Sequence, residues 1–329
     1  MESWHATFPL FENIKLLILV IDKIKNIYIT KFIYMCGIVG IYLKKKNLYD
    51  KLGSYLSGML DNMSTRGPDS AGFAIYNNRK LKVYKYSLCI PSDYKTKEIE
   101  NKLIEEFNDI LIKKISDHIV ASTKTTPKKF ISFIRENFRN ITIVGYGKSI
   151  EIFKQVGNPK EIVKKFNLNK FSGSHAIGHT RMATESAITL DGSHPYSTGE
   201  DECLVHNGSL SNHNNLRRIL IKKGQKFDSL NDTEVAAGYI SNQLSKNKSM
   251  NKALYNCLKH LDGFYTFIAG TNNGFAVLRD EIACKPAVIA ETKDYVAIAS
   301  EFQAMAHLPN VNQANIYEPE PGVIYTWGK

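Results

Sequence analysis

The residue best suited to covalent chemistry in this sequence is Cys36, which stands between Met35 and Gly37. A cysteine attacks as the thiolate, so it needs a nearby base or a lowered pKa. If Cys36 were the first residue of the mature chain, its own α-amino group would be that base, because an α-amine has an ordinary pKa of about 8. Removal of Met35 before this small residue would expose the amine. Taken alone, the string also fits a small buried thiol on a core strand.

Two further motifs carry arginines. Residues 66–72 (RGPDSAG) form a glycine-bounded loop suited to packing beside a small site. Residues 178–184 (GHTRMAT) place Arg181 at the end of an expected strand. The planar guanidinium of arginine can hold a carboxylate through two parallel hydrogen bonds, although a surface ion pair would use the same residue.

Two other motifs suit the remaining parts of a small charged substrate. His206-Asn207-Gly208 places a side-chain amide beside an unhindered backbone N–H at an expected strand end, which is what an oxyanion requires. Asp232 puts a carboxylate at an expected helix start. Each motif has a plainer reading, because Asn-Gly is typical of a hairpin turn and Asp232 could be a helix cap. All the motifs together, in this order, favour a catalytic site.

The elements that would position these residues form an α+β domain with antiparallel sheets. Apolar runs between turn signals predict strands, and caps and glycine or proline stops predict the helix ends. The expected strands are 37–43, 73–76, 81–86, 175–182, 202–206, 263–269, 274–278, 287–291 and 295–299, and the expected helices are 48–63, 212–223 and one starting at 231–232. The stretch 96–168 is expected to hold helices with one or two strands between them, and no domain boundary is apparent after Cys36.

The charge of the chain does not indicate a nucleic-acid-binding protein. The net charge is +11, and residues 36–170 hold 25 basic against 13 acidic side chains. These lysines are spread through expected helices, without an aromatic and basic face. We therefore interpret them as a solvated surface, and if they are functional we expect an acidic partner protein.

Five cysteines without a C-x-x-C pair predict neither a disulfide framework nor a zinc site, and they suit a reducing cytoplasm. His175 and His179 share one side of an expected strand, but no third metal ligand accompanies them, so no metal is expected. The apolar run 16–21 is far shorter than the roughly 20 residues of a membrane span. Residues 1–35 differ from the rest, and we interpret them as a mis-called start or, second, a removed pro-segment.

The full set of motifs resembles the class II glutamine amidotransferases, a family of N-terminal-nucleophile hydrolases. The resemblance covers residues 36 to about 307 and is specific as a set. It implies a four-layer αββα sandwich of two antiparallel sheets over residues 36–329. One departure is Glu185, which stands where the family often has a histidine. The segment 145–168 looks most like the stand-alone glutaminase subunit of archaeal-type glutamate synthase.

The resemblance also implies a role for each motif residue and requires no cofactor. Cys36 would attack the side-chain amide of glutamine, and Asn207 and Gly208 would form the oxyanion hole. The substrate-binding residues would be Arg181 for the α-carboxylate and Asp232 for the α-ammonium, with Thr184 lining the pocket. His194-Pro195 would be a supporting element.

No synthase domain follows by Lys329, so the ammonia is expected to go to a separate synthase subunit, in the first place a flavin-dependent glutamate synthase. Two alternatives stay open. One is a catalytically silent assembly subunit of such a synthase. The other is an N-terminal-cysteine amide hydrolase with another substrate, against which the pair Arg181 and Asp232 argues because it suits the charged ends of an amino acid.

Overall fold

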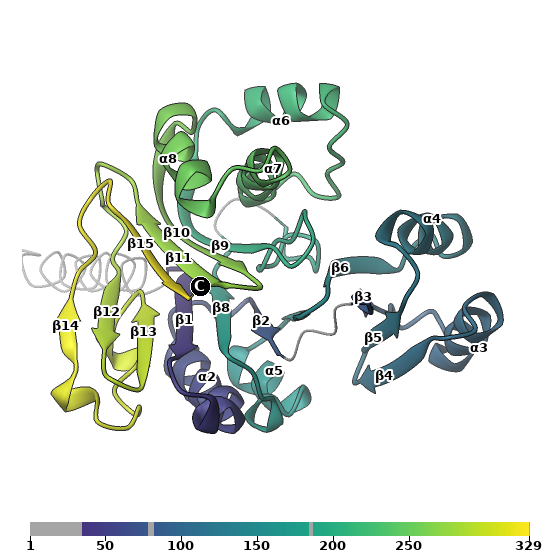
Figure 1. The fold of residues 1–329 in the computed structure, drawn as a ribbon, viewed down its shortest axis with the longest axis horizontal. Helices are drawn as coiled ribbons and strands as arrows, with labels where there is room; N and C mark the ends of the chain where they lie inside the picture. Colours follow the sequence, from purple (N-terminus) through teal and green to yellow (C-terminus); the bar gives the residue numbers. More distant parts are fainter. Residues whose placement is uncertain (1–34, 78–81, 184–186, 329) are drawn as a thin grey trace, which may run out of the picture. The chain divides into compact units, whose positions relative to one another are not determined.

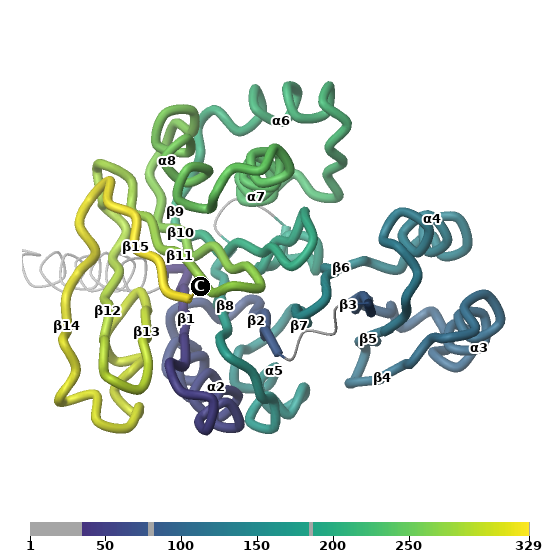
Figure 2. Tube along the Cα trace, in the orientation of Figure 1, coloured from purple at the N-terminus to yellow at the C-terminus, as the bar shows by residue number. Residues whose placement is uncertain are grey.

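The computed structural model describes residues 35–77, 82–183 and 187–328, so Thr184 and the apolar run 16–21 lie outside the described residues. From Cys36 onward the chain forms one compact unit, which Figures 1 and 2 show as ribbon and tube. It is a mixed α/β fold in which neighbouring strands run antiparallel. In the described part of the chain, none of the helices combines the length and the apolar character needed to cross a bilayer.

A seven-stranded sheet contains the strand that follows Cys36. Its order is β14-β12-β13-β1-β8-β2-β7, so β1 lies inside the sheet between β13 and β8. The strands are β1 (Gly37–Leu43), β2 (Ser70–Tyr76), β7 (Ile150–Val156), β8 (His175–Arg181), β12 (Val288–Glu291), β13 (Tyr295–Ala299) and β14 (Asn315–Tyr317). The register pairs Gly37 with Thr180, which brings the start of β1 to the end of β8.

A second sheet packs against the first through an apolar layer. Its order is β15-β11-β10-β9, with the strands β9 (Cys203–Leu210), β10 (Gly263–Thr271), β11 (Gly274–Arg279) and β15 (Ile324–Gly328). Ile38 of β1 packs in one core cluster with Val205 and Ile268 of this sheet. Val39 and Ile41 of β1 lie in a different cluster, because successive strand residues face opposite sides.

Helices cover the outer faces of both sheets, and Figure 1 shows them on opposite sides of the strands. The cluster that contains Val39 and Ile41 also contains apolar residues of α2 (Leu52–Asn62), α5 (Pro159–Lys165) and the 3-10 turn η2 (Leu168–Lys170). Apolar residues of α6 (His213–Lys222), α7 (Asp232–Leu244) and α8 (Met250–His260) pack on the second sheet. Three short 3-10 turns complete this part of the chain, η1 (Lys46–Lys51), η3 (Phe302–Ala304) and η4 (Val311–Gln313).

A lobe inserted between β2 and β7 has its own sheet and core. Its elements are β3 (Tyr84–Cys89), α3 (Thr96–Glu106), β4 (Leu111–Ile115), β5 (His118–Thr123), α4 (Pro127–Asn137) and β6 (Thr142–Gly147). The strand order β4-β5-β3-β6 with this βαββαβ succession is the ferredoxin-like arrangement. Both helices share one apolar cluster with the sheet, through Leu103 of α3 and Phe130 of α4.

The sequence-based prediction for 96–168 was wrong in its strand content, because four strands (β4 to β7) lie there. β4 illustrates the reason: its sequence LIKKI is largely exposed and shows no clean alternation, so its strand state comes from pairing with β5.

Predictions with a local physical signal were confirmed. Pro159 opens α5 and the Asn158 side chain caps it, and the predicted bounds of β1 are those observed. The expected helix 48–63 is divided into η1 and α2.

Candidate active site around Cys36

Cys36 immediately precedes β1, where three segments distant in sequence meet. Its carbonyl oxygen accepts hydrogen bonds from Arg66 Nε at 3.0 Å and from Asn207 Nδ2 at 3.1 Å. Its Sγ donates to the carbonyl oxygen of Met182 at 3.6 Å. The expected site residues Cys36 and Asn207, 171 positions apart, are therefore in direct contact.

The thiol of Cys36 has an environment that disfavours the thiolate. Burial raises the pKa of Cys36 above its ordinary value, and the hydrogen bond to Met182 and the nearby charges of Arg181 and Lys285 offset only part of this effect. While Cys36 is joined to Met35 by a peptide bond, it also has no α-amine. The site as folded thus needs an added base before the sulfur can attack.

Arg181 is the last residue of β8 and is 5% exposed. Its Nη1 donates to the carbonyl oxygen of Ala187 at 3.4 Å. The expected 66–72 loop is shorter in the structure, because Ser70 already opens β2. Residues 66–69 close on the end of β8, since Asp69 N donates to the Arg181 carbonyl at 3.0 Å and Asp69 Oδ2 accepts from Ala183 N at 2.8 Å. At Gly67 a Cβ atom would lie 2.5 Å from the Thr180 carbonyl, so this close approach requires glycine.

Asn207 and Gly208 lie inside β9, and the prediction that the strand ends at His206 was wrong. Pairing with β10 continues through both residues, which also excludes the hairpin-turn alternative. The sequence could not show this because glycine is unusual inside a strand. Gly208 has φ of +147°, and a Cβ there would lie 2.0 Å from the Phe264 carbonyl oxygen. The Asn207 side chain is 3% exposed and points to Cys36.

Asp232 opens α7, as predicted, and the cap of this helix is its neighbour Asn231, whose side chain accepts from Thr233 N. Asp232 Oδ2 accepts a hydrogen bond from Leu210 N at 2.8 Å, which ties the helix start to the end of β9. Within the described chain, the contacts of Asp232 lead to β9 and α7 and not to Cys36 directly.

Three buried histidines, His179, His194 and His206, contact one another at β9 next to Asn207. The sequence analysis gave them no role in catalysis. The rings of His179 and His194 stack with centroids 3.9 Å apart. His179 Nε2 lies 3.0 Å from the carbonyl oxygen of His206, and His206 N donates to His194 Nδ1 at 3.4 Å. The positions of His179 and His206 inside the motifs GHTR and HNG, and the pair His194-Pro195, were the available signal.

Arg66 and Glu301 form an ion pair beside Cys36 that the sequence analysis also missed. The neighbouring Ser300 fixes β1 from the same side, since its Oγ accepts from Ile38 N at 3.0 Å. Ser300 and Glu301 come directly after β13, so antiparallel pairing of β13 with β1 brings them to the Cys36 end of the sheet. That pairing is not visible from the sequence.

One group of residues in the described ranges could approach a metal ion, Cys89, Asp117 and His118, whose ligand atoms lie within 4.8 Å of one another. However, Asp117 Oδ2 is already 2.9 Å from Lys165 Nζ. Burial also raises the pKa of the Cys89 thiol to about 12. A metal would have to displace an ammonium group and a firmly held proton, so we interpret the group as structural.

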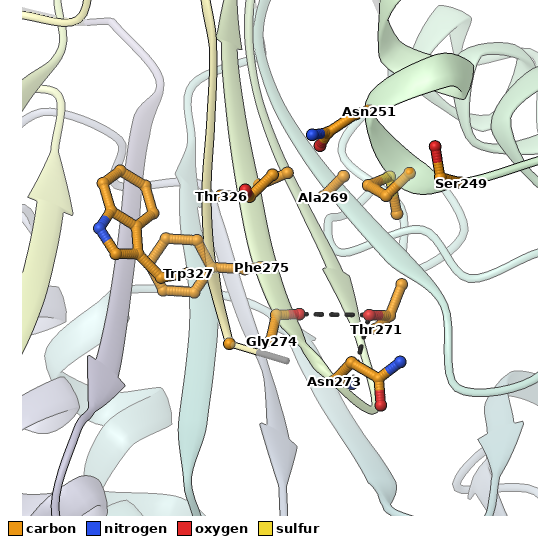
Figure 3. Close-up of a pocket in the computed structure, with 12 residues that line it drawn as sticks. Ser249, Asn251, Ala269, Thr271, Asn273, Gly274, Phe275, Thr326 and Trp327 are labelled. Atoms are coloured by element: carbon orange, nitrogen blue, oxygen red, sulfur yellow. Dashed lines mark hydrogen bonds between the residues drawn. The ribbon is translucent and has the colours of Figure 1, made fainter.

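The cavity in Figure 3 is separate from Cys36. It has a volume of about 250 Å³ at the β10–β11 hairpin and is lined by uncharged residues that include Asn273, Phe275 and Trp327. None of the expected site residues lines it, so we assign it no part in the chemistry at Cys36.

Comparisons with known proteins give the site its context. The family model of the glutamine amidotransferase domain matches residues 179–307. The glutamine amidotransferase-like protein GlxB of Rhizobium meliloti (strain 1021) is 49% identical over 300 residues, which are 89% of this chain and 98% of GlxB. The glutamine–fructose-6-phosphate aminotransferase of Buchnera aphidicola is 30% identical over 201 residues, 58% of this chain and 32% of that protein.

Among solved structures, the allosteric regulatory enzyme of purine biosynthesis matches with a TM-score of 0.59 at 21% identity. The match covers 89% of this chain and 47% of that chain, so the present chain spans about half of the solved one. At this identity the likeness concerns the fold.

Proposed function

Because the chain belongs to the class II glutamine amidotransferases, we propose that it hydrolyses the side-chain amide of glutamine through a thioester on Cys36. The products are glutamate and ammonia, and the ammonia is passed to a separate synthase. The observation that carries the proposal is the contact of Asn207 Nδ2 with Cys36 at the start of β1, next to the end of β8 where Arg181 lies.

The reaction begins with transfer of the thiol proton of Cys36 to its own α-amine. The sulfur then bonds to the amide carbon of glutamine, and the carbonyl oxygen becomes an oxyanion. When the C–N bond breaks, the protonated α-amine gives its proton to the leaving nitrogen, which departs as ammonia. Water attacks the thioester in the same manner, and the S–C bond breaks to release glutamate and restore the thiol.

The remaining site residues divide recognition and stabilisation between them. Asn207 Nδ2 and the Gly208 N–H are proposed to donate to the oxyanion. Arg181 is proposed to hold the α-carboxylate of glutamine and Asp232 its α-ammonium. Thr184 keeps its proposed place in the pocket wall, outside the described residues. This division suits an amino acid, whose two charged ends need partners of opposite sign.

We also propose that the working chain begins at Cys36, and the raised pKa of its thiol supports this. The half-buried thiol of a Cys36 joined to Met35 has no base of its own. A free α-amine of Cys36 would be held close to the sulfur by the covalent structure of the residue itself. Removal of residues 1–35, or initiation at Met35 with loss of methionine, would create this amine.

The order in which helices and sheets pack supports a four-layer αββα sandwich of the N-terminal-nucleophile type. We propose a flavin-dependent glutamate synthase subunit as the consumer of ammonia, and no cofactor in this chain. We place the protein in the cytoplasm, which is consistent with five free thiols among the described residues.

The test compares two forms of the protein, the full 329-residue chain and a chain initiated at Met35, after intact-mass analysis of each N-terminus. We expect the form that begins at Cys36 to release glutamate and ammonia in equal amounts and to be labelled on Cys36 by a glutamine-analogue electrophile. We expect the full chain to do neither while Cys36 is peptide-linked. Equal rates from both forms would refute the α-amine mechanism, and absence of labelling in both would favour a silent assembly subunit.

A panel of substrates separates glutamine hydrolysis from the cleavage of other amides. We expect glutamine to be turned over and simple acyl amides without the two charged ends to be poor substrates. If the acyl amides react as fast, Arg181 and Asp232 have no recognition role.

A further inference from the structure

We propose that this protein binds a compact polyanion, with two or more phosphate or carboxylate groups, in a basic pocket between the inserted lobe and the segment from α5 to η2. We call it the junction pocket. Its volume is about 400 Å³, within the range of small-molecule sites. It is lined by Asn77, Lys113, Lys114, Ile115, Ser116, Lys165, Phe166, Asn167, Lys170, Phe171 and Ser172.

All the charged side chains that line the junction pocket are positive. Four lysines line it and no acidic side chain does. Lys113 and Lys165 are paired with carboxylates that do not line the pocket, those of Glu151 at 3.9 Å and Asp117 at 2.9 Å. Four ammonium groups around one cavity repel one another, and a bound anion would relieve this repulsion.

Among the four lysines of the junction pocket, Lys114 and Lys170 are the ones that indicate a ligand. Neither side chain makes a hydrogen bond, ion pair or ring contact with another described residue, and both side chains are exposed. They come from opposite walls, Lys114 from β4 of the lobe and Lys170 from η2. An anion between them would therefore be held by both parts of the fold.

The floor and rim of the junction pocket favour a small ligand. Phe166 and Phe171 are buried and form an apolar base. Lys113 Nζ lies 5.2 Å from the centroid of the Phe171 ring, and its side chain is 61% exposed, so the ammonium lies at the open side of the pocket above this base. The amides and hydroxyls of the rim residues, such as Asn167 and Ser116, can donate further hydrogen bonds.

A concave site of this size differs from the extended basic surface with stacking aromatics that binds a nucleic-acid strand. Lysine is a common binder of phosphate as a point charge. The junction pocket shares no residue with the site around Cys36. Its occupation is thus an event separate from glutamine hydrolysis.

The test titrates the full chain with tripolyphosphate, pyrophosphate and citrate by calorimetry at fixed moderate salt. We expect one saturable site, and a rise of the melting temperature with ligand concentration as mass action requires. In the double variant Lys114→Gln and Lys170→Gln, we expect affinity to fall about tenfold or more, because two charge-assisted contacts are lost. Neither lysine side chain has a partner among the described residues, so the variant should melt near the wild type without ligand.

The matched control is Lys222→Gln and Lys223→Gln, which removes the same charge from exposed positions at the end of α6. We expect its affinity to equal that of the wild type. An equal loss in both variants, or no saturable binding of any of the three anions, would overturn the proposal. Tighter binding of a single-stranded oligonucleotide that both variants weaken alike would also overturn it, in favour of an extended surface.

Discussion

At the scale of single residues, the side chain of Asn207 is the most informative feature of the proposed site. It is buried, and one of its two N–H groups is used by the Cys36 carbonyl at 3.1 Å. The second N–H of the same amide can donate to an oxyanion formed at the neighbouring sulfur. The existing hydrogen bond fixes the orientation of the amide before substrate arrives.

We expect Asn207→Ala to lower kcat for glutamine by about 100-fold or more, since loss of one oxyanion donor costs about 2.7–4 kcal/mol. KM should change little, because the amide acts on the developing charge. Steady-state ammonia release from the chain that begins at Cys36 measures both. Asn169→Ala, at an exposed position of η2, is the control and should match the wild type. An effect confined to KM would contradict the assignment.

Asp232→Asn removes a charge but keeps an oxygen that can accept from Leu210 N. We therefore expect a melting temperature near that of the wild type and a fall in kcat/KM for glutamine of roughly 10–100-fold, from the loss of a charged hydrogen bond worth about 1.5–3 kcal/mol. The informative comparison is a glutamine analogue without the α-amine. If Asp232 holds the ammonium, the substitution should hardly affect turnover of that analogue.

Single-residue predictions from the sequence depended on motifs whose chemistry is local. Cys36, Arg181, Asn207 and Asp232 were chosen on that basis, and the structure brings Cys36 and Asn207 into contact. The Arg66 contact with the Cys36 carbonyl could not be predicted, because it depends on how residues 66–69 pack against the end of β8.

At the scale of elements, β9 shows how the backbone serves the site. It continues past Asn207 with Gly208 at φ of +147°, and β10 passes so close that a Cβ would lie 2.0 Å from the Phe264 carbonyl oxygen. Only glycine allows both the pairing and the position of its own N–H. The strand therefore combines a packing role with the proposed oxyanion role.

We expect Gly208→Ala to abolish turnover and to destabilise the fold by about 1–3 kcal/mol or more, because an unfavourable φ is combined with a backbone clash. Denaturant unfolding measures the change. Gly224→Ala is a matched control, since Gly224 has φ of +87° and nothing within 4 Å of the added Cβ. The control should lose stability through backbone strain alone and keep its activity. Equal destabilisation of both variants would show that the contact with Phe264 is unimportant.

The elements that the sequence predicted well are those with strong local signals. The apolar run of β1 and the capped starts of α5 and α7 were found at or near their observed bounds. Elements stabilised by partners were missed or misjudged. β4 is mostly exposed, and the short β14 is an edge strand that, among the described strands, pairs with β12 alone, so neither has a pattern of its own.

At the scale of the whole molecule, buried histidines between the sheets couple folding to pH. Burial lowers the pKa of His175 to about 4 and that of His179 to about 3. In the unfolded chain both would titrate near about 6.5. Between these values the unfolded chain binds protons that the folded chain does not, so the free energy of unfolding falls as the pH falls.

We expect acid lability that sets in below about pH 6.5 and continues to about pH 4. Because one pKa unit corresponds to about 1.4 kcal/mol, His175 alone would contribute a loss of about 3 kcal/mol across this range. Urea unfolding at a series of pH values from 7 to 4.5, at constant ionic strength, measures it. A free energy of unfolding that stays constant or rises on acidification would contradict the burial of neutral imidazoles.

The inserted lobe has a consequence for how such a chain can change over generations. Its first and last strands, β3 and β6, are hydrogen-bonded neighbours, and the flanking β2 and β7 also pair directly. The entry and exit of the lobe are therefore adjacent, and β2 and β7 would remain a hairpin if it were excised. We therefore expect a deletion or replacement of the lobe to leave the register of the seven-stranded sheet intact, which would let the lobe be exchanged as a module.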